Sequence, residues 1–138
     1  MEFNLSKKGL SIEPSVTLEI TAKAAAMRAA GEKVISFSVG EPDFNTPENI
    51  QDAGIEAIRK GITKYTPASG TPDLKAAICK KLKEDNGLEY KPSEIVVSNG
   101  GKHSLYNALM AILNPGDEVI FSAPYWVSYP ELVMIAGG

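Results

Sequence analysis

Residues 94–126 constrain the fold of this chain more than any other stretch, because their pattern predicts a strand, a helix and a second strand in close succession. Residues 94–98 and 118–121 are short runs rich in β-branched and other apolar side chains, which favour buried strands. Between them, residues 102–113 carry apolar side chains at helical spacing. A helix between two such strands is typical of a βαβ unit with parallel strands and a right-handed crossover. The sequence therefore predicts an α/β fold.

The two turns of this unit follow the carboxyl ends of the strands, the edge at which open α/β sheets bind ligands. The first turn puts Gly100 and Gly101 at a helix N-terminus, where backbone N–H groups and the helix dipole favour an anion. The second turn puts the indole of Trp126 on the same edge. This combination suits a flat, phosphorylated cofactor, although an ordinary glycine turn beside a core aromatic explains it equally well. The spacing is not G-x-G-x-x-G, which disfavours a dinucleotide site.

Composition excludes several classes of function. The chain has 138 residues, a net charge of -3 and 43% hydrophobic residues, so it carries no basic footprint for nucleic acid. No apolar run is long enough to span a membrane, and the first residues lack a signal-peptide pattern. The single cysteine, Cys79, excludes an intrachain disulfide and favours a reducing compartment. We therefore expect a cytoplasmic protein.

The rest of the chain predicts four more helices and one more strand. The helices cover residues 16–30, 46–60, 71–86 and 127–136, and the strand covers residues 34–39. Ser15, Thr46 and Thr71 are the expected N-caps, while residues 1–14 show no strong period. Parallel sheets usually have several strands covered on both faces, and three candidates are too few. The chain is therefore expected to be the first part of a larger α/β enzyme.

Five motifs then occur in an order that resembles a known family. They are the segments 38–47, 64–70, 98–102, 114–119 and 124–130. With them the chain resembles the fold-type-I pyridoxal phosphate enzymes, specifically the class I aminotransferases of the aspartate aminotransferase type. The resemblance implies an N-terminal arm (1–14), the start of a small domain (15–45) and the first part of a large, mainly parallel-sheet domain that binds pyridoxal 5'-phosphate (46–138). It also implies a homodimer with shared active sites.

The resemblance implies roles toward the cofactor for five residues. Gly100, Gly101 and Lys102 would form the turn that holds the phosphate, although lysine is only one variant at the last position. Trp126 would stack on the pyridine ring. Tyr65 would reach across the dimer interface to the phosphate of the partner subunit, although the alternative of a packed loop tyrosine stays open.

Roles toward the substrate follow in the same way. Gly40 would face the α-carboxylate with its main-chain N–H, and Trp126 would lie beside the bound amino acid. Lys102 and Ser15 would meet a second, distal carboxylate, which predicts aspartate or glutamate as amino donor and a 2-oxo acid as acceptor. Two alternatives stay open, because Lys102 could be occupied by the phosphate and Ser15 could be a plain N-cap.

No catalytic residue is expected in this stretch, because the family forms its Schiff base on a lysine far downstream. The 138 residues alone should therefore be inactive. No metal site is expected, since His103 has no second ligand nearby. Two other functions stay open: another pyridoxal phosphate enzyme, such as a carbon–sulfur lyase or synthase, and an aminotransferase-like ligand-binding domain of a regulator.

Overall fold

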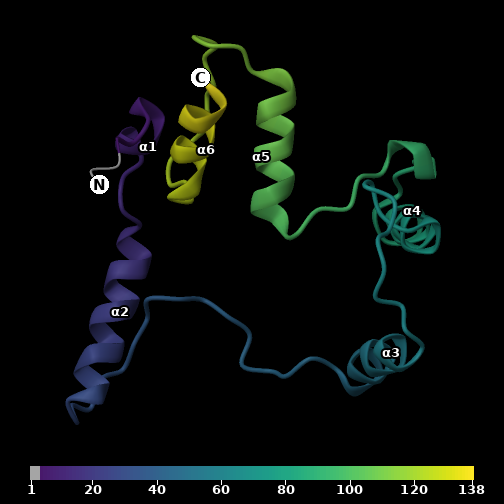
Figure 1. Cartoon of the computed structure of the whole chain (residues 1–138), viewed down its shortest axis with the longest axis horizontal. Helices are drawn as coiled ribbons and strands as arrows, with labels where there is room; N and C mark the ends of the chain where they lie inside the picture. The colour runs from purple at the N-terminus through teal and green to yellow at the C-terminus, as the bar shows by residue number, and fades with distance from the viewer. Residues whose placement is uncertain (1–3) are drawn as a thin grey trace. The chain divides into compact units, whose positions relative to one another are not determined.

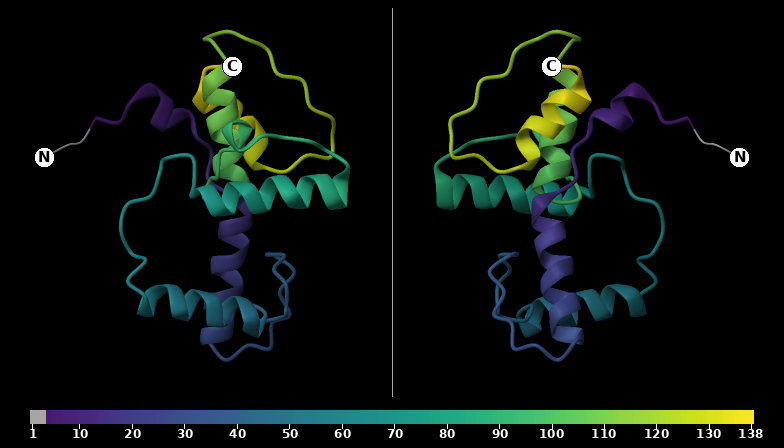
Figure 2. Two further views of the ribbon diagram at one scale, coloured as in Figure 1. Left: turned by 90° about the vertical axis from the view of Figure 1, so that its right-hand side faces the viewer. Right: turned by 90° about the vertical axis from the view of Figure 1, so that its left-hand side faces the viewer.

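A computed structural model of the chain describes residues 4–138. Its helices are drawn in Figure 1 and from two further sides in Figure 2. They are α1 (Lys7–Ser11), α2 (Val16–Ala29), α3 (Glu48–Arg59), α4 (Pro72–Asn86), the short 3-10 helix η1 (Pro92–Glu94), α5 (Gly101–Ile112) and α6 (Ser128–Ala136). The helices predicted from the sequence are confirmed with small shifts at their ends, whereas α1 lies in the arm, where no element was expected.

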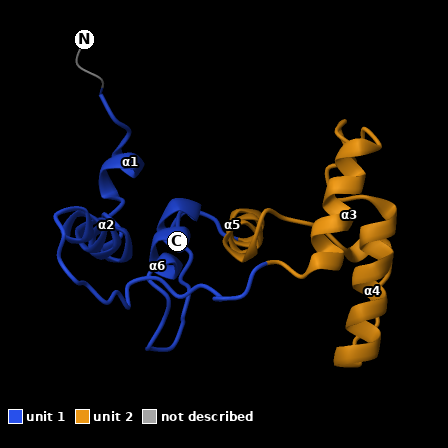
Figure 3. Cartoon of the chain, turned by 90° about the horizontal axis from the view of Figure 1, so that it is seen from below, with its two compact units in different colours: residues 1–45, 113–138 blue, residues 46–112 orange. Residues whose placement is uncertain are grey.

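The chain divides into two compact units (Figure 3). One unit consists of Met1–Asn45 and Leu113–Gly138 and contains α1, α2 and α6. The other unit consists of Thr46–Ile112 and contains α3, α4, η1 and α5. The expected division into an arm, a small-domain segment and a large-domain segment concerns the complete enzyme, and it stays a prediction.

Helix α4 is closed at both ends by the residues that the sequence indicates. The hydroxyl of Thr71 accepts a hydrogen bond from the N–H of Leu74 (3.4 Å), and Pro72 occupies the first turn. At the other end, Gly87 adopts a left-handed conformation with a φ of 67°. Its N–H donates to the carbonyl of Lys83 (3.2 Å), which satisfies one of the last acceptors of the helix.

Helix α3 begins differently from the prediction. Thr46 was expected as its N-cap, but the helix starts at Glu48 and Pro47 occupies the N-cap position without a side-chain acceptor. Instead, the side-chain amide of Gln51 donates to the carbonyl of Thr46. The N-terminal N–H groups of α3 therefore receive no side-chain cap from Pro47, because its ring carries no oxygen.

The predicted strands are not formed in residues 4–138, so the parallel βαβ unit is not confirmed by the chain as described. The segments 34–39, 94–98 and 118–121 are without a strand, although Ile95 in the second of them has extended backbone with φ -104° and ψ 130°. Extended backbone becomes a sheet only when a neighbouring strand accepts its N–H and C=O groups. No such ladder joins the three segments, which leaves the family's sheet dependent on other strands.

The side chains of the first extended segment nevertheless alternate between two environments. Val34, Ser36 and Ser38 are half-buried, whereas Ile35 and Phe37 are 84% and 95% exposed. Among the described residues only Ala24 is buried, at 8% exposure. The apolar side chains needed for a core are therefore present, but most of them are exposed in the described chain.

The first unit is held together by contacts between its distant segments. The Lys8 ammonium of the arm donates to the carbonyl of Ile135 near the end of α6. The N–H of Gly116, in the turn after α5, donates to the carbonyl of Gly137 (2.9 Å). The ring of Phe121 meets that of Tyr125 edge to face, with their centroids 4.8 Å apart. These contacts bring the arm and the segment before α6 onto the last helix.

Candidate functional site

The turn at residues 98–102 leads from extended backbone directly into α5. Gly100 has a positive φ of 86°, a conformation that residues other than glycine rarely adopt. Its N–H donates to the carbonyl of Ser98 (2.9 Å), and its own carbonyl accepts the N–H of Ser104 (3.3 Å). The backbone thereby turns sharply, and α5 begins at Gly101.

The two glycines leave open space beside this backbone. A Cβ atom built on Gly100 or Gly101 would meet no heavy atom within 4 Å. The N–H groups in the first turn of a helix have no partner inside the helix, and the helix dipole favours an anion at this end. The ammonium of Lys102, on the next residue, can balance the charge of a bound anion. The chemistry of this turn therefore fits a phosphate group.

His103 supports the turn in a way that the sequence did not reveal. The N–H of Asn99 donates to Nδ1 of His103 (3.1 Å), so the imidazole reaches back over the first turn of α5. This arrangement is similar to a capping box, in which the third helical residue accepts an N–H at the helix start. A polar side chain at that position was the available signal, although histidine is not the usual residue there.

A pocket of about 300 Å³ lies beside the same turn. Its lining includes the polar residues Ser98, Ser104 and Asn107, together with Val96 and Ala108. Ser98 precedes the two glycines in the sequence and Ser104 follows them, so residues from both sides of the turn line the pocket. The hydroxyl and amide groups here are neutral hydrogen-bonding groups close to the proposed anion position.

Tyr65 lies in the loop between α3 and α4. Its side chain is fully exposed (108%), so it does not pack on its neighbours in the described chain. An exposed phenol on a loop is available to a group outside this unit. The role of Tyr65 toward the phosphate of a partner subunit stays a prediction.

Three further candidates, Ser15, Gly40 and Trp126, belong to the first unit. Ser15 is the N-cap of α2 as predicted, but its hydroxyl makes no capping hydrogen bond. Gly40 is exposed, and a Cβ atom built on it would meet nothing within 4 Å. Trp126 is 51% exposed, and its carbonyl accepts the N–H of Tyr129 (3.0 Å). Each of these residues therefore leaves polar groups or open surface that a ligand can use.

The structure brings only part of the predicted site together. Gly100, Gly101 and Lys102 follow one another at the start of α5, and Tyr65 belongs to the same unit. Ser15, Gly40 and Trp126 belong to the other unit. The convergence of the two groups on one ligand therefore stays a prediction.

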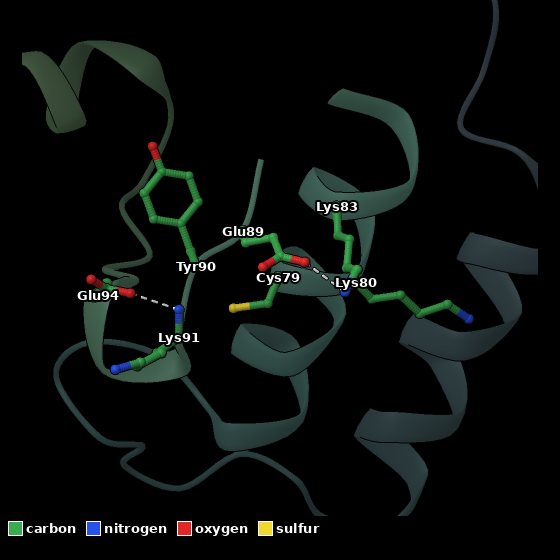
Figure 4. Close-up of a pocket in the computed structure, with 7 residues that line it drawn as sticks. All are labelled: Cys79, Lys80, Lys83, Glu89, Tyr90, Lys91 and Glu94. Atoms are coloured by element: carbon green, nitrogen blue, oxygen red, sulfur yellow. Dashed lines mark hydrogen bonds and ion pairs between the residues drawn. The ribbon is translucent and has the colours of Figure 1, made fainter. Parts of the chain in front are cut away.

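A larger pocket, of about 630 Å³, surrounds Cys79 on α4 (Figure 4). Both carboxylates that line it already have partners in the lining. The ammonium of Lys83 lies 2.7 Å from a carboxylate oxygen of Glu89, and Glu94 accepts the N–H of Lys91 (2.7 Å). None of its lining residues belongs to the five motifs, so size alone does not make it the functional site.

Residues 4–138 offer neither a metal-binding cluster nor a membrane-spanning helix. Within these residues, no three His, Cys, Asp or Glu side chains are grouped so that they could hold a metal ion. None of the described helices is long and apolar enough to cross a membrane.

Comparison with known proteins identifies similar sequences. The family model "Aminotransferase class I and II" matches residues 32–138. An aspartate aminotransferase from Bacillus sp. (strain YM-2) is 58% identical over 134 residues, which are 97% of this chain and 34% of the relative. An aspartate/prephenate aminotransferase from Nitrosomonas europaea is 55% identical, with the same coverage of 97% and 34%. The chain thus spans about a third of the length of these relatives.

Solved structures of aspartate aminotransferases are also similar to this chain. Aspartate aminotransferase from Thermus thermophilus with maleate matches with a TM-score of 0.95 and 45% identity, over 99% of this chain and 36% of that one. The aspartate aminotransferase from Rhizobium meliloti matches with a TM-score of 0.92 and 49% identity, over 99% of this chain and 34% of that one. The backbone described above, without strands of its own, therefore follows the course of the chain in these enzymes.

Proposed function

Because this chain belongs to the class I and II aminotransferase family, we propose that it supplies the first third of an aspartate aminotransferase that uses pyridoxal 5'-phosphate. The complete enzyme moves an amino group from an amino acid to a 2-oxo acid. The observation that carries the proposal is the turn before α5, where Gly100 adopts a φ of 86° and Gly101 opens the helix N-terminus. This is the geometry that a phosphate needs to approach a backbone.

The residues of this chain hold the cofactor and the substrate. Gly100, Gly101 and Lys102 bind the phosphate, and Trp126 covers one face of the ring. Gly40 offers its N–H to the α-carboxylate. When bound, pyridoxal phosphate supplies an electron sink that stabilises negative charge at the α-carbon of the amino acid. The lysine that moves the proton is expected beyond this stretch, so the residues described here bind and orient.

The substrate is a dicarboxylic amino acid. The second carboxylate of aspartate or glutamate needs a cationic partner, because an unpaired charge in a closed site is costly. Lys102 supplies that charge, and the Ser15 hydroxyl, which makes no capping bond, supplies a donor. The relatives named aspartate aminotransferase, and the Thermus enzyme with maleate, support this choice of substrate.

The enzyme works as a homodimer, and it is cytoplasmic. The full exposure of Tyr65 supports the homodimer, since a phenol that binds the phosphate in a partner subunit must point away from its own subunit. The single cysteine, Cys79, supports a reducing compartment. Sedimentation and cell fractionation of the complete protein test these two statements separately.

The test is a full-length chimera in which residues 1–138 are joined to the remainder of the Bacillus sp. relative. Loaded with pyridoxal phosphate, it should convert aspartate and 2-oxoglutarate to oxaloacetate and glutamate. Release of ammonia with bond cleavage would indicate a lyase instead. Ligand binding without any product would indicate the ligand-binding domain of a regulator. The similarity to named aspartate aminotransferases at over half identity does not favour either alternative.

A further inference from the structure

The loop that carries Tyr65 is attached to the segment that enters the glycine turn. The N–H of Val97 donates to the carbonyl of Ser69 (3.0 Å), so the two segments meet although they are far apart in sequence. Val97 lies just before the turn at residues 98–102, and Ser69 lies just after Tyr65 and its neighbours. The contact is therefore a direct link between two of the predicted phosphate-binding elements.

Gly70 makes this approach possible for two reasons. Its φ is +108°, in the region that favours glycine. A Cβ atom at this position would also lie 2.5 Å from Cγ2 and 3.0 Å from Cβ of Val97, which is closer than carbon atoms approach. The N–H of Gly70 donates to the carbonyl of Pro67 (2.9 Å), which closes the turn. No residue with a side chain satisfies both conditions.

Helix α4 fixes the junction from a third side. The ammonium of Lys75 donates to the hydroxyl of Ser69 (2.9 Å). Ser69, Gly70, Lys75 and Val97 are all half-buried, whereas most of the described chain is exposed. This junction is thus one of the few places where separate segments of the chain are packed against one another.

We propose that Gly70 is a positioning residue, which holds the Tyr65 loop at a fixed place relative to the Gly100–Gly101 turn through its contact with Val97. The inference rests on the proposed function, in which both elements bind cofactor phosphate. In that proposal Tyr65 binds the phosphate in the partner subunit, whereas the Gly100–Gly101 turn binds the phosphate in its own subunit. The junction therefore connects a residue of one active site to the phosphate turn of the other.

The test measures the affinity of the cofactor-free chimera for pyridoxal phosphate and for pyridoxal, which lacks the phosphate. Gly70→Ala should weaken binding of pyridoxal phosphate by about tenfold or more, the worth of one charge-assisted hydrogen bond, and leave pyridoxal binding unchanged. Gly61→Ala is the matched control, because Gly61 also has a positive φ, of +70°, but a Cβ there would meet nothing within 4 Å. This control should keep both affinities.

Two further variants test the positioning role, so that the test does not depend on Gly70→Ala alone. Val97→Ala in the Gly70→Ala background should recover part of the lost affinity, since it removes the Cγ2 atom that the new methyl group meets. Lys75→Met removes the bond to Ser69 without a change of backbone, and should weaken pyridoxal phosphate binding without an effect on pyridoxal. It therefore tests the junction even if Gly70→Ala does not fold.

The outcomes separate the two claims. Equal losses for pyridoxal phosphate and pyridoxal, or full affinity in Gly70→Ala and Lys75→Met, would overturn the positioning role while the proposed function stands. An unmodified chimera that shows no preference for pyridoxal phosphate over pyridoxal would overturn the proposed function, and the positioning role with it.

Discussion

The N–H of Asn99 donates to Nδ1 of His103, 3.1 Å away, across the start of α5. The bond joins the residue before the two glycines to a residue one turn into the helix. The imidazole accepts this bond through Nδ1, and the space beside Gly101 stays open. The turn is therefore stabilised by a side chain that leaves the space beside the two glycines open.

Replacing His103 tests this support. His103→Leu removes the acceptor and should destabilise the full-length chimera by about 0.5–1.5 kcal/mol, the net worth of one hydrogen bond. Unfolding in denaturant measures the change. His103→Gln supplies an acceptor again and should recover part of the loss; equal stability of all three proteins would show that the bond contributes nothing.

The two glycines of the turn should respond in opposite ways. Gly100→Ala forces a side chain into a left-handed conformation and should cost about 1–2 kcal/mol of stability. Gly101→Ala lies in the helix and should change stability by no more than about 1 kcal/mol, in the stabilising direction. Because its methyl group occupies the open space, Gly101→Ala should nevertheless weaken pyridoxal phosphate binding.

Thermal unfolding without cofactor and titration with pyridoxal phosphate separate these effects. If Gly101→Ala kept full cofactor affinity, the phosphate could not lie beside this backbone. Gly87→Ala is a suitable control, because Gly87 has a φ of +67° but caps α4, away from the turn. It should lose stability and keep its affinity for the cofactor.

Tyr65 should contribute one hydrogen bond to the phosphate. Tyr65→Phe removes only the phenolic oxygen from a fully exposed side chain, so the fold should not change. Cofactor affinity should fall by about 1.5–3 kcal/mol, the worth of a hydrogen bond to a charged group. Tyr90→Phe, at a side chain that lines the Cys79 pocket, should have no effect; identical titrations for both variants would contradict the role of Tyr65.

We expect Lys102 to decide the choice of substrate in the complete enzyme. Lys102→Ala should lower kcat/KM for aspartate more than for alanine, by a difference of about 1–3 kcal/mol, because only aspartate has a second carboxylate. Lys80→Ala removes an exposed lysine of α4, whose ammonium lies 3.9 Å from Glu84, and should leave both substrates unaffected. Equal losses on the two substrates would assign Lys102 to the phosphate alone.

The isolated 138 residues should not transaminate, and they should not form a stable fold. Ala24 is the sole buried residue among those described, while side chains such as Phe37 and Ile120 are 95% and 97% exposed. Slow amide hydrogen exchange should therefore be missing in the isolated chain and appear in the full-length chimera. Strong protection in the isolated chain would show that it folds without the rest.

Signals within a few residues of each helix predicted the helices well. The predictions that the structure does not confirm depend on other parts of the chain. The threonine–proline start and the glycine end of α4 act within a few residues, so the sequence contains the whole cause. At Thr46 the same pattern failed, because Pro47 stayed outside the helix. The strands are not confirmed for another reason: a strand needs hydrogen-bond partners from distant segments, which no local pattern supplies.

The candidate site likewise contains features that depend on local sequence and features that depend on distant segments. The sharp turn at Gly100 and Gly101 could be predicted from the sequence alone, and the structure gives Gly100 its positive φ, while their role toward a phosphate stays a prediction. The contact between Gly70 and Val97 could not be predicted, because it depends on how two separate segments fold together. Whether Ser15 and Trp126 reach the same ligand depends on a still larger assembly.

The alternation along residues 34–39 has a consequence for synthesis on the ribosome. These residues form no strand ladder among the described residues, and the side chains of Ile35 and Phe37 are exposed, so another extended chain can pair with them. In a polypeptide as long as the relatives, about two thirds of the residues are still to be made when Gly138 emerges. At roughly 5–20 residues per second this interval lasts tens of seconds. We expect that during that time the same segment of a neighbouring nascent chain can compete with the downstream strands for these residues.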